Sequence, residues 1–231
     1  LDVSKWDYQL GTGSQYGMIG WGNNELQYYT NESSNLFFDT CDNDNQCLVI
    51  SGFRQTYESS EYTSARIRSA GSGIRTYGRI DVRAKLPTAQ GTWPAIWMLP
   101  EDMIYGGWPA SGEIDIMEMG QRQAFRDLHD EHNGGNGLNN STVNQVVGAN
   151  AIFYADEALV PDNPTGAASI SWDPDDDYCR PYYNYDNLTD RFVKYRLYWN
   201  PDSILFSIID NEVEHFLYAD VFNVDSVSDE F

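Results

Sequence analysis

The chain has 231 residues, a length that suits one β-sandwich or one α/β domain better than two small domains. Its formal net charge of −21 would repel nucleic acid, an anionic membrane surface or a sulfated polymer. No apolar run approaches the roughly 20 residues that a membrane span requires. These features argue against nucleic-acid and membrane functions and favour a neutral binding partner.

Several features of the sequence are signs of secretion. The sequence begins at Leu1 rather than Met, which is typical of a mature or trimmed product. Cys41 and Cys47 flank the polar loop DNDNQ and could close a short disulfide, whereas Cys179 has no obvious partner. Glycosylation sequons occur at Asn31, Asn139, Asn140 and Asn187. We therefore expect an extracellular protein.

Short alternating segments recur along the chain and predict strands. They include CLVISGF at 47–53, TSARIRS at 63–69, YGRIDVRAKLP at 77–87 and FVKYRLYW at 192–199. The stretch SILFSIIDNEVEHFLY predicts a hairpin that turns near Asp210 and Asn211. The only helix candidate is short, at 121–132, and the stretches 133–145 and 173–190 are typical of loops. This pattern indicates an all-β antiparallel sandwich formed by a single domain, residues 1–231.

The stretch GEIDIMEMG at 112–120 places three carboxylates among apolar residues. Because side chains alternate along a strand, Glu113 and Asp115 share one face and Glu118 falls on the other. One extra residue, at Met117 or its neighbour, would form a β-bulge and return Glu118 to the first face. Converging carboxylates disfavour each other's ionisation, so at least one should have a raised pKa.

This cluster meets the needs of retaining glycoside hydrolysis. One ionised carboxylate attacks, a second gives its proton to the leaving oxygen, and the two lie about 5–5.5 Å apart. Two other interpretations stay open at this point. Clustered carboxylates could bind a hard cation, or the segment could be an edge strand with solvated acids.

Residues 93–118, WPAIWMLPEDMIYGGWPASGEIDIME, resemble the signature of family-16 glycoside hydrolases, and specifically of laminarinase-type endo-β-1,3-glucanases. Further similar segments follow in the family's order: NNELQYYT at 23–30, YTSARIRS at 62–69, the stretch 77–100 and YRLYWNPDSILFSIIDNE at 195–212. The resemblance covers about residues 6 to 218. It implies a jelly-roll β-sandwich of two curved antiparallel sheets, the concanavalin A-like lectin and glucanase fold, with an open sugar-binding cleft.

The resemblance also implies roles for individual residues. In the family's E-x-D-x-x-E motif the first Glu is the nucleophile, the Asp supports it and the last Glu is the acid/base, here Glu113, Asp115 and Glu118. The residues expected to contact sugar are Trp97, Trp108, Trp93, Asn24, Arg66 and Glu25. Each of the three Trp residues could instead belong to the core, Trp93 most readily. Arg66 could form an ordinary surface salt bridge, and Glu25 could fix a loop.

The sequence departs from the family pattern in three places. Ile152 and Val193 stand where laminarinases usually carry His residues that line the cleft. The family's closing C-terminal strand has no counterpart, so the domain is expected to be C-terminally incomplete and a second chain could supply that strand. A structural calcium, which often draws on that strand, stays open. His129 and His132 could hold a metal on one helix face, although a solvated charged segment is the default interpretation.

We therefore expect a secreted, retaining endo-glucanase that hydrolyses β-1,3 linkages in laminarin-like β-glucans and requires no cofactor or catalytic metal. Its partner would be a neutral polysaccharide. The alternatives are a non-catalytic β-glucan-binding recognition protein on the same fold, and another family-16 hydrolase acting on mixed-linkage glucan or agarose.

Overall fold

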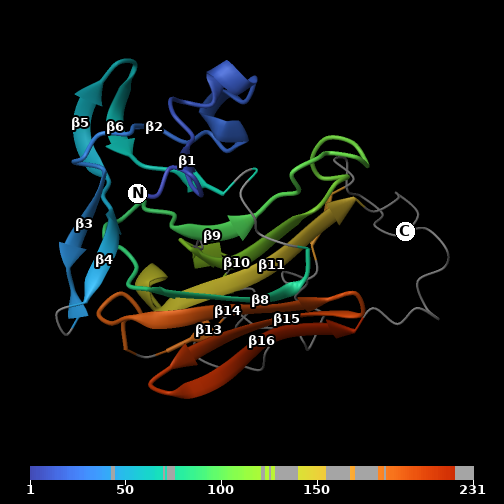
Figure 1. Ribbon diagram of the computed structural model, residues 1–231. Coiled ribbons are helices and arrows are strands. Elements are labelled where there is room, and N and C mark those ends of the chain that lie inside the picture. The colour runs from blue at the N-terminus through green and yellow to red at the C-terminus, as the bar shows by residue number, and fades with distance from the viewer. Residues whose placement is uncertain are drawn as a thin grey trace. The chain divides into compact units, whose positions relative to one another are not determined.

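The computed structural model of the protein (Figure 1) describes residues 1–42, 45–69, 71, 76–120, 123, 124, 126, 127, 140–154, 167–169, 182–184 and 186–221. They belong to two compact units, Leu1–Arg75 and Thr76–Phe231, and each is described by itself. The single domain expected from the sequence stays a prediction. Within the described part of the chain, no helix has the length and apolar character needed to cross a membrane.

The described residues of the first unit form short strands and two complete 3-10 helices. Its elements are β1 (Asp7–Tyr8), η1 (Ser14–Tyr16), η2 (Ile19–Gly22), β2 (Gln27–Tyr29), β3 (Leu36–Thr40), β4 (Gln46–Ile50), β5 (Phe53–Tyr57), β6 (Ser60–Ser64) and β7 (Ile67–Arg68). They form a three-stranded sheet in the order β2-β6-β5 and two strand pairs, β3-β4 and β1-β7. The β2–β6 pairing is parallel, whereas the other pairings of this unit are antiparallel.

Two of the expected strands in this unit need correction. The stretch 63–69 is divided into β6 and β7, because Ser64 still pairs with β2 whereas Ile67 pairs with Tyr8 of β1. The stretch 47–53 is divided as well, since β4 ends at Ile50 and Phe53 begins β5. In both cases the chain changes its pairing partner within an otherwise apolar, alternating stretch.

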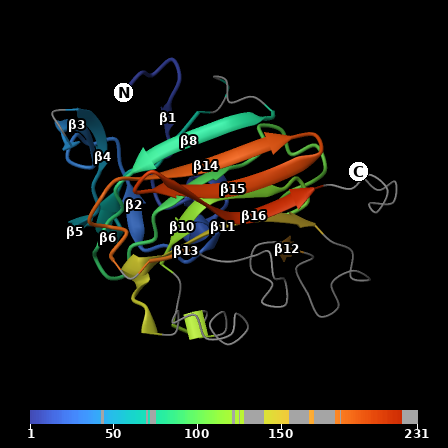
Figure 2. The same cartoon turned by 90° about the horizontal axis from the view of Figure 1, so that it is seen from below.

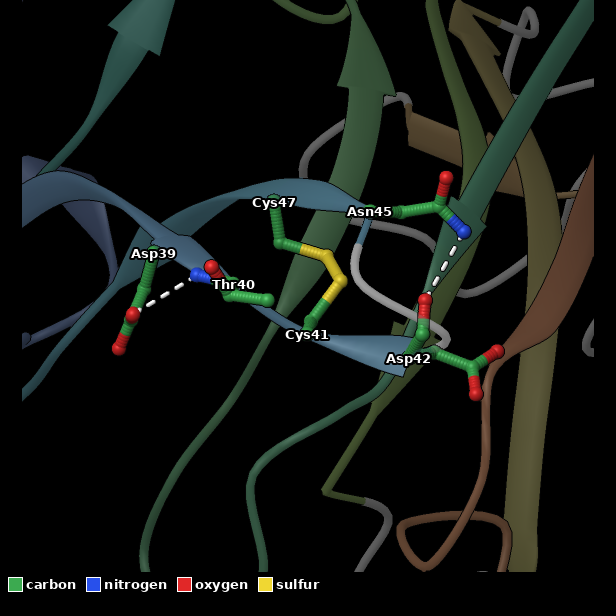
Figure 3. The surroundings of a disulfide bond; sticks show 6 residues. All are labelled: Asp39, Thr40, Cys41, Asp42, Asn45 and Cys47. Atoms are coloured by element: carbon green, nitrogen blue, oxygen red, sulfur yellow. Dashed lines mark hydrogen bonds between the residues drawn. A yellow bond between two sulfur atoms is a disulfide. The ribbon is translucent and has the colours of Figure 1, made fainter.

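A disulfide joins Cys41 and Cys47 and closes the β3–β4 hairpin, as the sequence predicts (Figure 3). The intervening loop is tightened by the backbone N–H of Cys41, which donates to the carbonyl oxygen of Asn45 at 2.8 Å. The side-chain amide of Asn45 donates to the carbonyl oxygen of Asp42 at 2.9 Å. This covalent closure fixes a two-stranded hairpin that would be marginal by itself.

The described residues of the second unit form two antiparallel sheets (Figures 1 and 2). The first, in the order β12-β11-β10-β9 with β13 also paired to β11, comprises β9 (Ala95–Met98), β10 (Glu113–Met119), β11 (Val146–Tyr154), β12 (Ala167–Ser169) and β13 (Tyr182–Tyr183). The second, in the order β16-β15-β14-β8, comprises β8 (Gly78–Ala84), β14 (Val193–Asn200), β15 (Ser203–Asp210) and β16 (Val213–Val221). The 3-10 helix η5 (Val143–Gln145) precedes β11.

Alternation along the strands explains why these two sheets pack face to face. In β14 the side chains of Val193, Tyr195 and Leu197 are fully buried, whereas those between them are partly exposed. One buried cluster contains residues of both sheets: Leu86, Ile116, Met117, Met119, Val147, Ala149, Leu188, Val193, Tyr195, Leu197, Ile204, Phe206, Ile208 and Leu217. Burial of this apolar area is the main source of stability, and the predicted all-β sandwich is confirmed.

The β15–β16 hairpin turns where the sequence predicts. Asn211 and Glu212 both have positive φ angles, 48° and 67°, as a two-residue hairpin turn requires. Of the expected helix at 121–132, the described residues 123, 124, 126 and 127 are helical. His129, His132, Asn139, Cys179 and residues 222–231 lie outside the described residues.

Candidate active site

A β-bulge in β10 brings the three carboxylates of GEIDIMEMG to one face. Against β9, Asp115 pairs with Trp97 and Met117 pairs with Ile96, so Ile116 is the extra residue. Against β11 the register also shifts by one residue between Asp115 and Glu118. The bulge predicted from the carboxylate spacing is confirmed.

The burial of β10 shows the consequence for its side chains. Ile116 and Met117 are consecutive in sequence, yet both belong to the buried core cluster, at 2% and 1% exposure. Glu113 and Glu118 are partly buried and Asp115 is 2% exposed. Because strictly alternating neighbours cannot both enter the core, the bulge leaves the three carboxylates together on the opposite face.

Two exposed indoles donate hydrogen bonds to the two glutamates. Nε1 of Trp108 donates to Oε2 of Glu113 at 2.8 Å, and Nε1 of Trp93 donates to Oε1 of Glu118 at 3.0 Å. Trp108 and Trp93 are 53% and 52% exposed, so Trp93 is not a core residue. Hydrogen bonds to a charged carboxylate are stronger than those between neutral groups and orient it.

Tight turns before β10 place Trp108 beside Glu113. Ser111 Oγ donates to the carbonyl oxygen of Gly106 at 2.6 Å and accepts from the backbone N–H of Tyr105 at 3.2 Å. The peptide bond between Trp108 and Pro109 is cis, and the N–H of Gly112 donates to the Pro109 carbonyl oxygen. The loop is therefore held by its own hydrogen bonds just before the strand begins.

The electrostatics of the cluster follow from burial and from the proximity of like charges. Burial raises the pKa of Asp115 to about 9, with further contributions from the charges of Glu118 and Glu113 and from a hydrogen bond with Glu113. Burial also raises the pKa of Glu118, against the opposing effect of the Trp93 hydrogen bond. Asp115 is therefore neutral at pH 7. This agrees with the prediction from the sequence that at least one carboxyl of the cluster has a raised pKa.

Neighbouring strands supply the rest of this face, because directly paired residues point the same way. Trp97 of β9 pairs with Asp115, and Ile152 of β11 pairs with Glu113, so both lie on the carboxylate face. Buried Asn150 pairs with Asp115; sequence reasoning missed it, although alternation along β11 places it there. Val193 by contrast is fully buried in the core on β14, so this position does not line the carboxylate face.

The other three expected sugar-contacting residues lie in the first unit. Asn24 is exposed and has a positive φ of 58°. Glu25 accepts hydrogen bonds from the Tyr29 hydroxyl at 2.8 Å and from the side-chain amide of Gln27. These contacts fix the Glu25 carboxylate in one orientation.

Arg66 of the same unit is held by a hydrogen bond and by an aromatic ring. Its Nε donates to Oε1 of Gln9 at 2.6 Å, and its guanidinium lies 4.3 Å from the centroid of the Trp21 ring. A planar guanidinium stacked on an indole is well oriented for hydrogen bonding. No group of three or more His, Cys, Asp and Glu suited to a metal ion occurs among the residues that the structure describes.

A β-sandwich with clustered carboxylates beside exposed indoles is typical of enzymes that act on carbohydrates. The chain belongs to glycoside hydrolase family 16, since residues 6–159 match the family described as "XgeA-like, catalytic GH16 domain". The family resemblance and the fold class expected from the sequence are thereby confirmed.

Relatives of known name agree with this assignment. The chain is 47% identical to a beta-glucanase of Rhodothermus marinus over 119 residues, which is 51% of this chain and 38% of that protein. It is 37% identical to glucan endo-1,3-beta-glucosidase A1 of Niallia circulans over 183 residues, which is 76% of this chain and 25% of that protein. The chain thus spans well under half the length of these two relatives.

A solved structure is also similar. The laminarinase catalytic domain of Thermotoga maritima superposes with a TM-score of 0.66 and 27% sequence identity. The alignment covers 96% of this chain and 72% of that domain. The likeness therefore extends over both units of this chain.

Proposed function

We propose that this chain is the catalytic part of a retaining endo-β-1,3-glucanase that acts on laminarin-like β-glucans. The observation that carries the proposal is the bulge in β10, which gathers Glu113, Asp115 and Glu118 on one face of the sheet. The names of the relatives, beta-glucanase and glucan endo-1,3-beta-glucosidase, support the substrate class.

In the first step, the Glu113 carboxylate attacks the anomeric carbon and the bond to the glycosidic oxygen breaks. Glu118, whose raised pKa favours the protonated acid, gives its proton to that leaving oxygen. Neutral Asp115 donates a hydrogen bond to Glu113, which favours the ionised form of the nucleophile. The hydrogen bond from Trp108 acts in the same direction.

In the second step, the glycosyl-enzyme ester is hydrolysed. Glu118, now ionised, takes a proton from an incoming water, and the resulting hydroxide attacks the anomeric carbon while Glu113 leaves. Two inversions at the same carbon retain the β-configuration. The three carboxylates differ in role because their environments differ: burial is the largest cause of the raised pKa of both Asp115 and Glu118, and the charge of Glu113 adds to it.

Substrate binding is assigned to the aromatic and polar residues around this cluster. Sugar rings present apolar C–H faces, which stack on exposed indoles such as Trp108 and Trp93. Trp97, beside Asp115 on β9, is the third candidate platform. The acidic chain, with a net charge of −21, suits a neutral glucan better than a sulfated one.

We also propose that the protein acts outside the cell. The disulfide between Cys41 and Cys47 supports this location, because disulfides persist in oxidising compartments. An extended glucan is also too large to be taken up intact, so a hydrolase that cuts it internally is useful outside the membrane.

The proposal is tested by incubating the protein with laminarin, mixed-linkage glucan and agarose and analysing the released oligosaccharides. Release of β-1,3-linked oligosaccharides from laminarin is expected, and the matched Glu113→Gln variant should bind laminarin without releasing product. Laminarin binding without product by the unaltered protein would instead favour a recognition protein. Faster cleavage of mixed-linkage glucan or agarose would overturn the substrate assignment alone.

A further inference from the structure

Trp93 contacts the acid/base candidate through its polar edge rather than through its ring face. Its Nε1 lies 3.0 Å from Oε1 of Glu118 and donates a hydrogen bond to it. Trp93 is 52% exposed, whereas Glu118 is partly buried in the sheet. A residue whose only role was stacking on sugar would need no such bond.

Two contacts hold the backbone around Trp93 in place. Two residues further along, Ala95 pairs directly with Glu118, so the start of β9 lies beside the end of β10. The N–H of Met119 donates to the Pro94 carbonyl oxygen at 3.2 Å. These contacts fix the indole relative to Glu118 without any contribution from a ligand.

Gly120 allows the end of β10 to lie close to the segment that carries Trp93. Its φ of +120° is unfavourable for a residue with a side chain, and an added Cβ would lie 3.1 Å from the Thr92 carbonyl oxygen and 3.7 Å from Cα of Trp93. Any larger residue at this position would push against the backbone that carries the indole. The position of the Trp93 backbone therefore depends on glycine at the end of β10.

We propose that Trp93 is a positioning residue for Glu118, whose hydrogen bond orients the carboxyl group and sets the pH at which it exchanges its proton. This role rests on the proposed function, in which Glu118 is the acid and base. Trp108 makes the corresponding bond to Glu113, so each glutamate has its own indole donor.

The hydrogen bond from Trp93 acts against the other influences on the Glu118 carboxyl. Burial and the charge of Glu113 raise its pKa, whereas the hydrogen bond from Trp93 lowers it. Asp115 and Glu113 are the titratable side chains that face it within β10. From the paired strands, the facing residues are Ala95, Trp97, Gly148, Asn150 and Ile152, and none of these titrates.

The test compares Trp93→Phe with the unaltered protein. Phenylalanine keeps an aromatic ring for stacking but has no N–H to donate. Without that bond, the basic limb of the kcat/KM profile on laminarin should move up by about one pH unit, with a smaller effect on KM. The carbon-13 titration of the Glu118 carboxyl should move in the same direction, and this readout needs no turnover.

Two further variants separate positioning from folding. Gly120→Ala should displace the indole and move the basic limb in the same direction, whereas Trp199→Phe, in β14, should leave it unchanged. In Trp93→Phe, the basic limb of the kcat/KM profile and the carbon-13 titration of Glu118 could both stay unchanged while only KM rises. That result would overturn the proposal and leave Trp93 as a residue that only stacks on sugar. If the unaltered protein cleaves no β-glucan, the proposed function fails. The carbon-13 titration still decides whether Trp93 affects the pH at which Glu118 exchanges its proton.

Discussion

Replacing Asp115 by Asn should change how the stability of the protein depends on pH. Asp115 is 2% exposed, and burial, aided by the charges of Glu118 and Glu113, raises its pKa to about 9 from 3.8. Above pH 3.8 the unfolded chain releases the proton that the folded protein keeps. The contribution of Asp115 to the free energy of unfolding therefore falls as pH rises from about 4 to about 9.

The size of this effect follows from the same two values. Each pH unit between them is worth about 1.4 kcal/mol, so keeping Asp115 protonated at pH 7 costs at most about 4 kcal/mol. Asparagine has nearly the same shape as the neutral acid and carries no proton to lose. Its contribution to stability is therefore independent of pH.

Urea unfolding at several pH values between 4 and 9 measures the difference. The stability of Asp115→Asn relative to the unaltered protein should increase steadily with pH over that window. Parallel stability curves for the two proteins would refute the reasoning, because they would mean that Asp115 ionises equally easily in the folded and unfolded states. The amide can also still donate to Glu113, so Asp115→Asn should keep more activity than Asp115→Ala.

Two other predictions concern the β10 bulge and the ion pair between Arg191 and Asp210. Ile116→Ala and Met117→Ala should each lower the free energy of unfolding by about 2–5 kcal/mol, because both side chains are buried; a negligible loss for either would contradict the bulge. Arg191 donates to buried Asp210 at 2.7 and 2.5 Å and lowers its pKa. Arg191→Met should cost about 3–5 kcal/mol in urea unfolding at pH 7, and less once falling pH protonates Asp210; a cost independent of pH would refute this.

One sheet of the second unit could be predicted well because its strands are long and alternate. The segments around β8, β14, β15 and β16 show one apolar face each, and that face enters the core. The bulge was also predictable, since three carboxylates at the spacing of Glu113, Asp115 and Glu118 cannot share a face without an extra residue. The register then identifies Ile116 as that residue.

Other features depend on contacts that alternation does not encode. The parallel pairing of β2 with β6 joins residues more than 30 positions apart, and β1, β7 and β13 are only two residues long. The hydrogen bonds from Trp93 and Trp108 to the glutamates depend on loop geometry before β9 and β10. The sequence predicts that these indoles contact sugar, but it could not predict which way their N–H groups point.

Trapping the glycosyl-enzyme tests the account most directly. An activated 2-deoxy-2-fluoro β-1,3-glucoside slows the second step of a retaining reaction, so the covalent intermediate accumulates and mass spectrometry can locate it. The account predicts one sugar per protein, bonded to the peptide that contains Glu113. A label on Glu118 or Asp115, or an α-configured product from laminarin with no label formed, would contradict it.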